Sequence, residues 1–175
     1  MKTFFALCIF CSIQVFGQET KPTLTHLKTY SPEEWNKWYF DDYDLTTVET
    51  GNWNKWKCEI WGMQMIVETA VANNWQSWKI GPKGGACTLV KKNKYNSWTL
   101  VSDAKTYQFV SATKDLSSWT MTGSGTLKAY IFAPGDWDHW VIEGDLPGVN
   151  NPEAVVACLF IPVFSGTIRA VHKLK

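Results

Sequence analysis

The segment Trp53-Asn54-Lys55-Trp56-Lys57-Cys58 carries the pattern that decides the fold, because variants of it recur along the chain. Each copy has an aromatic or apolar residue, two polar residues and a tryptophan, and successive tryptophans are 18 to 22 residues apart. The tryptophans that close the six copies are Trp38, Trp56, Trp78, Trp98, Trp119 and Trp140. A constant period of this length is typical of one supersecondary unit used repeatedly. The sequence therefore predicts six copies of one unit.

Each tryptophan starts an alternating pattern. The residue two positions after it is apolar in every copy: Phe40, Cys58, Ile80, Leu100, Met121 and Ile142. Alternation with a period of two indicates a strand with one buried face. A second run follows most copies after a turn, as in Thr106–Val110, and is rich in β-branched and aromatic residues. Six units of two strands predict about twelve antiparallel strands, which close into a barrel to remove exposed edges.

The C-terminal part departs from this pattern. Asn151 suits a helix N-cap, Pro152 the first helical position and Glu153 the positive end of a helix. The residues that follow, up to Phe164, are almost all apolar, so the helix must be buried on every side. We expect a helix at about 152–164 that the strands surround or that caps them, and Pro162 should kink or end it. Leu159 and Phe160 are predicted core residues, together with the six tryptophans.

This arrangement resembles a known family. About twelve antiparallel strands followed by one apolar C-terminal helix resemble the tubby-like barrel of tubby and the LURP-one-related proteins. The run from Pro152 to Ile161 is similar to the Ala/Val/Ile-rich terminal helices of that group. The resemblance implies that the helix threads the closed barrel. Tubby domains bind phosphoinositide head groups through basic residues, and the nearest counterpart here, Lys91-Lys92-Asn93-Lys94, is interpreted as a solvated turn.

The N-terminus predicts export. Met1-Lys2 precedes a mostly apolar stretch from Phe4 to Phe16, which is typical of a secretory signal peptide spanning residues 1–17. Its apolar stretch is shorter than the ~20 residues of a membrane span. Residues 18–29 are interpreted as an N-terminal leader, with a first edge of the sheet as the alternative, and residues 30–175 as one barrel domain. The protein is therefore expected to be secreted or periplasmic, with an outer-membrane location as the weaker alternative.

Charge and cysteine content exclude several classes. Of 17 basic and 16 acidic residues, Lys2 lies in the expected signal peptide, so the rest of the chain is close to neutral. Binding to nucleic acid needs a basic footprint, so that class is excluded. Cys58, Cys87 and Cys158 remain after the signal peptide, an odd number that forbids a complete disulfide framework. They are either small buried residues or one bridge and one free thiol.

Catalytic and metal-binding patterns are weak in this sequence. His26, His139 and His172 are isolated, and the segment from Asp136 to His139 occupies the turn position of the sixth repeat. The run Asp41-Asp42-Tyr43-Asp44 has the oxygen ligands that calcium needs, but we favour its interpretation as a solvated hairpin turn. We therefore expect no enzyme activity, no catalytic residue, no metal and no cofactor.

Candidate ligand-binding residues lie at the start of the repeats. An aromatic residue opens five of the six copies: Trp35, Trp53, Trp75, Tyr95 and Trp137. Asp138 directly follows the last of these residues. These side chains either pack on the end of the barrel or form an exposed ring. Exposed aromatic rings next to amide and carboxylate groups would stack on sugars or lie at a membrane interface.

These observations predict a non-enzymatic binding module whose ligand is unknown, with a glycan or a lipid surface as the partners considered. Two alternatives remain open. One is a carbohydrate-binding module that uses the turn aromatics. The other is a small outer-membrane barrel, although spanning strands need ~9–11 residues with an outward apolar band.

Overall fold

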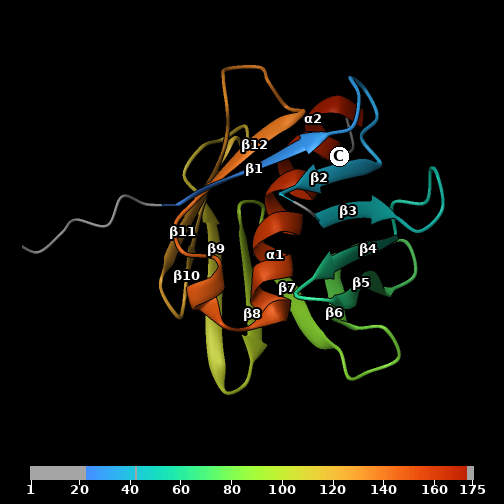
Figure 1. Cartoon of the computed structure of the whole chain (residues 1–175), viewed down its shortest axis with the longest axis vertical. Coiled ribbons are helices and arrows are strands. Elements are labelled where there is room, and N and C mark those ends of the chain that lie inside the picture. Colours follow the sequence, from blue (N-terminus) through green and yellow to red (C-terminus); the bar gives the residue numbers. More distant parts are fainter. Residues whose placement is uncertain (1–22, 42, 173–175) are drawn as a thin grey trace, which may run out of the picture.

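The protein folds into one closed antiparallel β-barrel. The structure, a computed structural model, describes residues 23–41 and 43–172, and of residues 169 and 172 it describes only the backbone. Within these residues twelve strands each pair with their neighbours in sequence, and β1 pairs with β12 to close the cylinder (Figure 1). The predicted all-β barrel with a C-terminal helix is confirmed. The predicted signal peptide, residues 1–17, lies outside the described residues.

The repeat unit is one hairpin of the barrel. The even-numbered strands carry the six tryptophans: β2 (Lys37–Phe40), β4 (Lys55–Ile60), β6 (Asn74–Pro82), β8 (Ser97–Ser102), β10 (Ser118–Thr122) and β12 (His139–Glu143). The odd-numbered strands lie between them: β1 (Leu24–Thr29), β3 (Tyr43–Thr47), β5 (Met63–Val71), β7 (Thr88–Lys94), β9 (Lys105–Ser111) and β11 (Thr126–Ile131). All six repeat turns therefore lie at one end of the barrel, which we call the tryptophan end.

Strand β1 completes the sixth unit. It pairs with β12 from Leu24 opposite Glu143 to Lys28 opposite His139, and with β2 on its other side. The chain after β12 leaves the sheet, so the N-terminal strand takes the place of the missing partner. The predicted leader is therefore wrong from Leu24 onward, and the barrel begins there rather than at residue 30. Residues 18–22 of that leader lie outside the described part of the chain.

The C-terminal helix α1 (Pro152–Pro162) lies inside the barrel (Figure 1). Asn151 caps it, because the Asn151 Oδ1 atom accepts a hydrogen bond from the Ala154 N–H at 2.8 Å. The Asn151 Nδ2 atom donates to Ser102 Oγ at 3.0 Å and to Asp103 Oδ2 at 2.9 Å, which fixes the helix start to the end of β8. We call this the helix-start end of the barrel.

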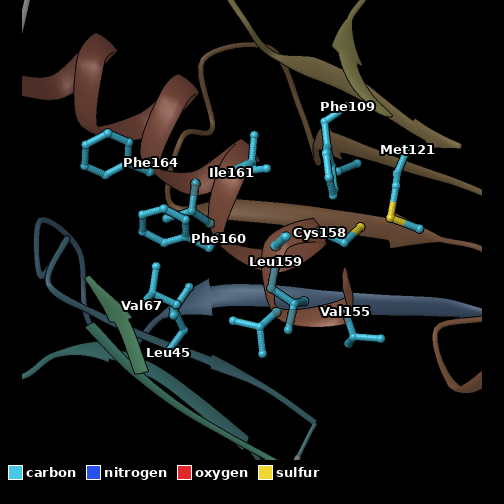
Figure 2. Close-up of a cluster of buried hydrophobic side chains, with 14 of the residues drawn as sticks. Leu45, Val67, Phe109, Met121, Val155, Cys158, Leu159, Phe160, Ile161 and Phe164 are labelled. Carbon is cyan, nitrogen blue, oxygen red and sulfur yellow. The ribbon is translucent and has the colours of Figure 1, made fainter. Parts of the chain in front are cut away.

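The barrel interior is filled by this helix and by the inward side chains of the strands. Leu159 and Phe160 are almost fully buried, with exposed fractions of 0% and 1%. Figure 2 shows their side chains pointing from the helix toward residues of the surrounding strands, among them Val67. Since Phe160 also lies edge-on to Trp78, with ring centroids 4.8 Å apart, the helix contacts the tryptophans directly.

The helix does not end at Phe164 as predicted. The backbone continues past Pro162 as a wider π-helical segment, η2 (Val163–Ile168), and a final turn, α2 (Arg169–His172). A proline removes one hydrogen bond of an α-helix, and a wider turn restores pairing around it. Gly166 permits close packing there, because a Cβ atom at this position would lie 2.8 Å from Trp140 Cζ2 and 2.9 Å from the Leu116 carbonyl oxygen.

The six tryptophans form a buried layer at the tryptophan end, each with an exposed fraction of at most 2%. In three copies the indole N–H donates to the carbonyl three residues earlier, at 2.8 to 3.0 Å: Trp38 to Trp35, Trp56 to Trp53 and Trp119 to Leu116. This bond joins each tryptophan to its own turn. The spacing of the repeat thus provides a hydrogen-bond acceptor for the buried indole in these three copies, whereas the indole N–H groups of Trp78 and Trp98 are buried without a partner among the described residues.

In the sixth copy a side chain of the helical segment bridges the same two groups. The Trp140 Nε1 atom donates to Thr167 Oγ1 at 2.7 Å, and that hydroxyl donates to the Trp137 carbonyl oxygen at 2.9 Å. One hydroxyl thus locks the end of η2 to the repeat turn.

We expect Leu159→Ala to lower the free energy of unfolding by about 2–5 kcal/mol, because it opens a cavity in the packed core. Chemical denaturation measures this change. Val110→Ala, at a β9 position that is 45% exposed, is the control and should change stability by roughly 0.5 kcal/mol or less. A Leu159→Ala protein as stable as this control would show that the helix is not enclosed.

We expect Thr167→Val to cost about 1–3 kcal/mol, because it leaves the buried Trp140 indole N–H without its partner at nearly constant side-chain volume. Thr167→Ser keeps the hydroxyl and should lose less. Thermal unfolding of the two variants checks this, and a Thr167→Val protein as stable as the wild type would mean that the hydrogen bond of the hydroxyl does not contribute to stability.

Candidate ligand-binding site

Most of the turn aromatics that were predicted to bind a ligand instead pack against other aromatic side chains. Trp35, Trp53 and Trp137 are half-buried and lie beside the tryptophans of their own repeats, with ring centroids 5.8 to 6.3 Å apart. Trp75 lies edge-on to Phe164 at 5.2 Å. The capping interpretation therefore accounts for these four side chains.

Tyr95 and Asp138 differ from that group. Tyr95 is 48% exposed, and its hydroxyl donates to the Lys114 carbonyl oxygen. Asp138 is half-buried beside Asp136. The turns place all six predicted residues at the tryptophan end, but they do not form one continuous exposed aromatic surface.

A cleft that the sequence reasoning missed lies on the outside of β1, β2 and β3. It has a volume of about 490 Å³ and is lined by Tyr30, Tyr39, Asp41, Tyr43 and Asp44. We call it the tyrosine cleft. Its size falls within the range of about 300–1,000 Å³ that is typical of small-molecule sites.

The strand register builds this cleft. Trp38 and Phe40 point into the barrel, so Tyr39 between them points outward. Tyr39 lies opposite Asp44 on β3, and the two side chains share the outer face. Asp41 has a φ of 46°, which turns the chain back toward Tyr43. Tyr39 at an outward strand position was the signal in the sequence that could have revealed the cleft.

Contacts within the cleft hold Tyr30 in place. Its hydroxyl donates to Asp44 Oδ1 at 2.6 Å, and its ring packs edge-on against Tyr39 with centroids 5.3 Å apart. The hydrogen bond to the Asp44 carboxylate raises the pKa of Tyr30, since ionisation would place two negative charges together. The Lys37 ammonium lies 4.0 Å from the Tyr30 ring centroid. The cleft is therefore ordered before any ligand enters.

His26 and His139, which are isolated in the sequence, come together in a second cluster at the seam of β1 and β12, so the interpretation of these two histidines as isolated is wrong. The ring nitrogens His26 Nδ1 and His139 Nε2 are 2.8 Å apart and share a hydrogen bond. Phe132 stacks on His139 with centroids 4.3 Å apart. His139 Nδ1 also lies 3.7 Å from Asp136 Oδ2.

The two ionisable groups of this cluster shift in opposite directions. Burial, followed by the charges of Lys28 and His26, lowers the pKa of His139 to about 4. The hydrogen bond with Asp138, followed by burial, raises the pKa of Asp136 to about 6. The imidazole of His139 is therefore neutral at pH 7, and its proximity to Asp136 is not an ion pair there.

Other predicted sites are placed as follows. In the described part of the chain, no group of three or more His, Cys, Asp or Glu side chains is arranged to hold a metal ion. Lys91–Lys94 lies in strand β7, so its prediction as a turn is wrong.

Cys58 and Cys158 are buried, which raises the pKa of each thiol to about 12. Cys87 is exposed, and all three cysteines are free thiols.

Comparison with protein families, with curated proteins and with solved structures found no match to this chain. None of the helices among residues 23–41 and 43–172 has both the length and the apolar character that a membrane span requires.

The opposite pKa shifts of Asp136 and His139 predict that their effects on the pH dependence of stability partly cancel. The raised pKa of Asp136 adds stability at low pH that is lost as the pH rises from about 4 to about 6. The lowered pKa of His139 adds stability above pH 6.5 that is lost as the pH falls toward 4. We therefore expect Asp136→Asn to make stability rise more steeply than in the wild type between pH 4 and 6.5, and His139→Gln to make it rise less steeply.

Urea unfolding at several pH values measures these slopes relative to the wild type, which removes the contribution of the other carboxylates. Slopes that change in the same direction in both variants would contradict the two pKa shifts.

Proposed function

We propose that this protein is a secreted or periplasmic, non-enzymatic binding module that takes a carbohydrate in the tyrosine cleft. The export part of this proposal rests on the N-terminal sequence. The observation that carries the binding part is one open cleft of about 490 Å³ lined by three tyrosines and two aspartates.

The chemistry of the cleft suits a sugar. The faces of tyrosine rings pack against the C–H surface of a pyranose, while carboxylates accept hydrogen bonds from its hydroxyl groups. Tyr30 and Tyr39 are already held by their mutual contact and by Asp44. A pre-ordered site loses little side-chain entropy when the ligand binds. The sequence suggested carbohydrate binding at the turn aromatics, whereas the site proposed here is the tyrosine cleft.

The alternatives have less support. The outward positions of β4, β6 and β7 carry Lys57, Lys79 and Lys91, which are exposed, and a lipid-facing band would be apolar there. This argues against a small outer-membrane barrel. The relationship to the tubby-like barrel is a proposal supported by the twelve strands around a C-terminal helix.

Titration calorimetry against a panel of soluble oligosaccharides tests the proposal. For a glycan that binds, we expect Tyr39→Ala to weaken affinity about tenfold or more, because central aromatic contacts typically contribute above 1 kcal/mol and 1.4 kcal/mol is tenfold. Tyr95→Ala is the matched control, since it removes a tyrosine at the tryptophan end. Loss of binding in Tyr95→Ala alone would place the site at the turn aromatics, and a panel without any binding glycan would refute the proposal.

A further inference from the structure

A second, smaller cavity opens at the helix-start end of the barrel. It has a volume of about 140 Å³. Its floor consists of Phe40, Ile60, Leu146 and Val155, which come from β2, β4, the segment after β12 and α1 and are all buried. An engineered apolar cavity of about 150 Å³ stays dry and binds benzene. The floor of this cavity is thus suited to an apolar group the size of one benzene ring.

The rim of the cavity holds a tryptophan in an unfavourable backbone conformation. Trp61 has a φ of 51° and is 40% exposed, and it forms the β4–β5 turn with Gly62. Left-handed backbone costs roughly 1–2 kcal/mol for an ordinary residue, and asparagine or glycine is preferred in such turns. Trp61 is therefore costly both for its conformation and for its exposed apolar surface. Strained residues of this kind cluster at ligand sites.

The rim also carries a negative charge. Asp41 and Tyr43 line both this cavity and the tyrosine cleft, and Asp41 is exposed. Among the described residues that line the small cavity there is no lysine, arginine or histidine. Aromatic faces and carboxylates both attract organic cations. On the neighbouring outer face the Lys37 ammonium lies 4.0 Å from the centroid of the Tyr30 ring, a contact of this kind within the tyrosine cleft.

We propose that this cavity binds a small organic cation, an ammonium group carried on a benzene-sized apolar body. The apolar body lies on the floor between Phe40, Ile60 and Val155, under the ring of Trp61. The ammonium points outward to Asp41. The proposal does not depend on carbohydrate binding, because its ligand is different and its cavity shares only Asp41 and Tyr43 with the tyrosine cleft.

Three probes of one shape test the charge preference: benzylammonium, benzyl alcohol and benzoate, each titrated into the full protein and followed by NMR. We expect benzylammonium to bind about fivefold or more tightly than benzyl alcohol, and benzoate to bind most weakly. Asp41→Asn should bring benzylammonium and benzyl alcohol to similar affinities. Benzoate binding as tightly as benzylammonium would overturn the proposal.

A second variant tests the location. Trp61→Asn should weaken benzylammonium binding about tenfold while leaving the melting temperature unchanged or higher, because asparagine tolerates the left-handed conformation. The matched control is Ala104→Gly, which relieves the same kind of backbone conformation (φ of 58°) in the β8–β9 turn and should not affect binding.

Nuclear Overhauser contacts from the probe to the methyl groups of Ile60 and Val155 provide a direct readout in the wild-type protein. Contacts to those methyl groups support the site. Unchanged affinity in Trp61→Asn, or contacts elsewhere only, would show that the cavity is not the binding site.

Discussion

A closed barrel of twelve strands encloses more space than its own inward side chains can fill, and the structure depends on how this space is occupied. The solution is one helix that is apolar on all sides, together with six tryptophans at one end. Large aromatic residues each bury about 150–250 Å². The repeat therefore fills the interior: each copy contributes one tryptophan side chain that packs between the sheet and the helical segment.

The packing of this interior also explains the helix geometry. Phe160 and Phe164 face the tryptophans of β4 and β6, while Gly166 allows the chain to approach Trp140 on the other side. A regular α-helix past Pro162 would lack one hydrogen bond, and the wider segment keeps the chain in contact with the tryptophan layer. The hydroxyl of Thr167 then takes the position that a direct indole–carbonyl bond has in three other copies.

The repeat made the barrel and the buried tryptophans predictable, because period-two alternation and a constant spacing are local signals. Strand β1 was not predictable in this way, since its inward residues include Thr25 and Thr29 and its partner in the unit, β12, lies near the other end of the chain. The tyrosine cleft was missed for another reason. Tyr30 directly follows β1, whereas Tyr39 and Asp44 lie opposite each other on β2 and β3, so the cleft forms only when these consecutive elements fold back on one another. Which side chains share a face across a hairpin depends on its register, and a single segment does not reveal that register.

The pairing of β1 with β12 has a consequence for how the chain reaches this structure. The hydrogen bond between His26 and His139 joins residues that are 113 positions apart, and the helix that fills the interior follows both. Contacts of such large sequence separation are slow to form, because the loop entropy must be lost before they stabilise anything. The first strand emerges from the ribosome long before its partner and before the core helix exist. Folding is therefore expected to complete only after the whole chain is made.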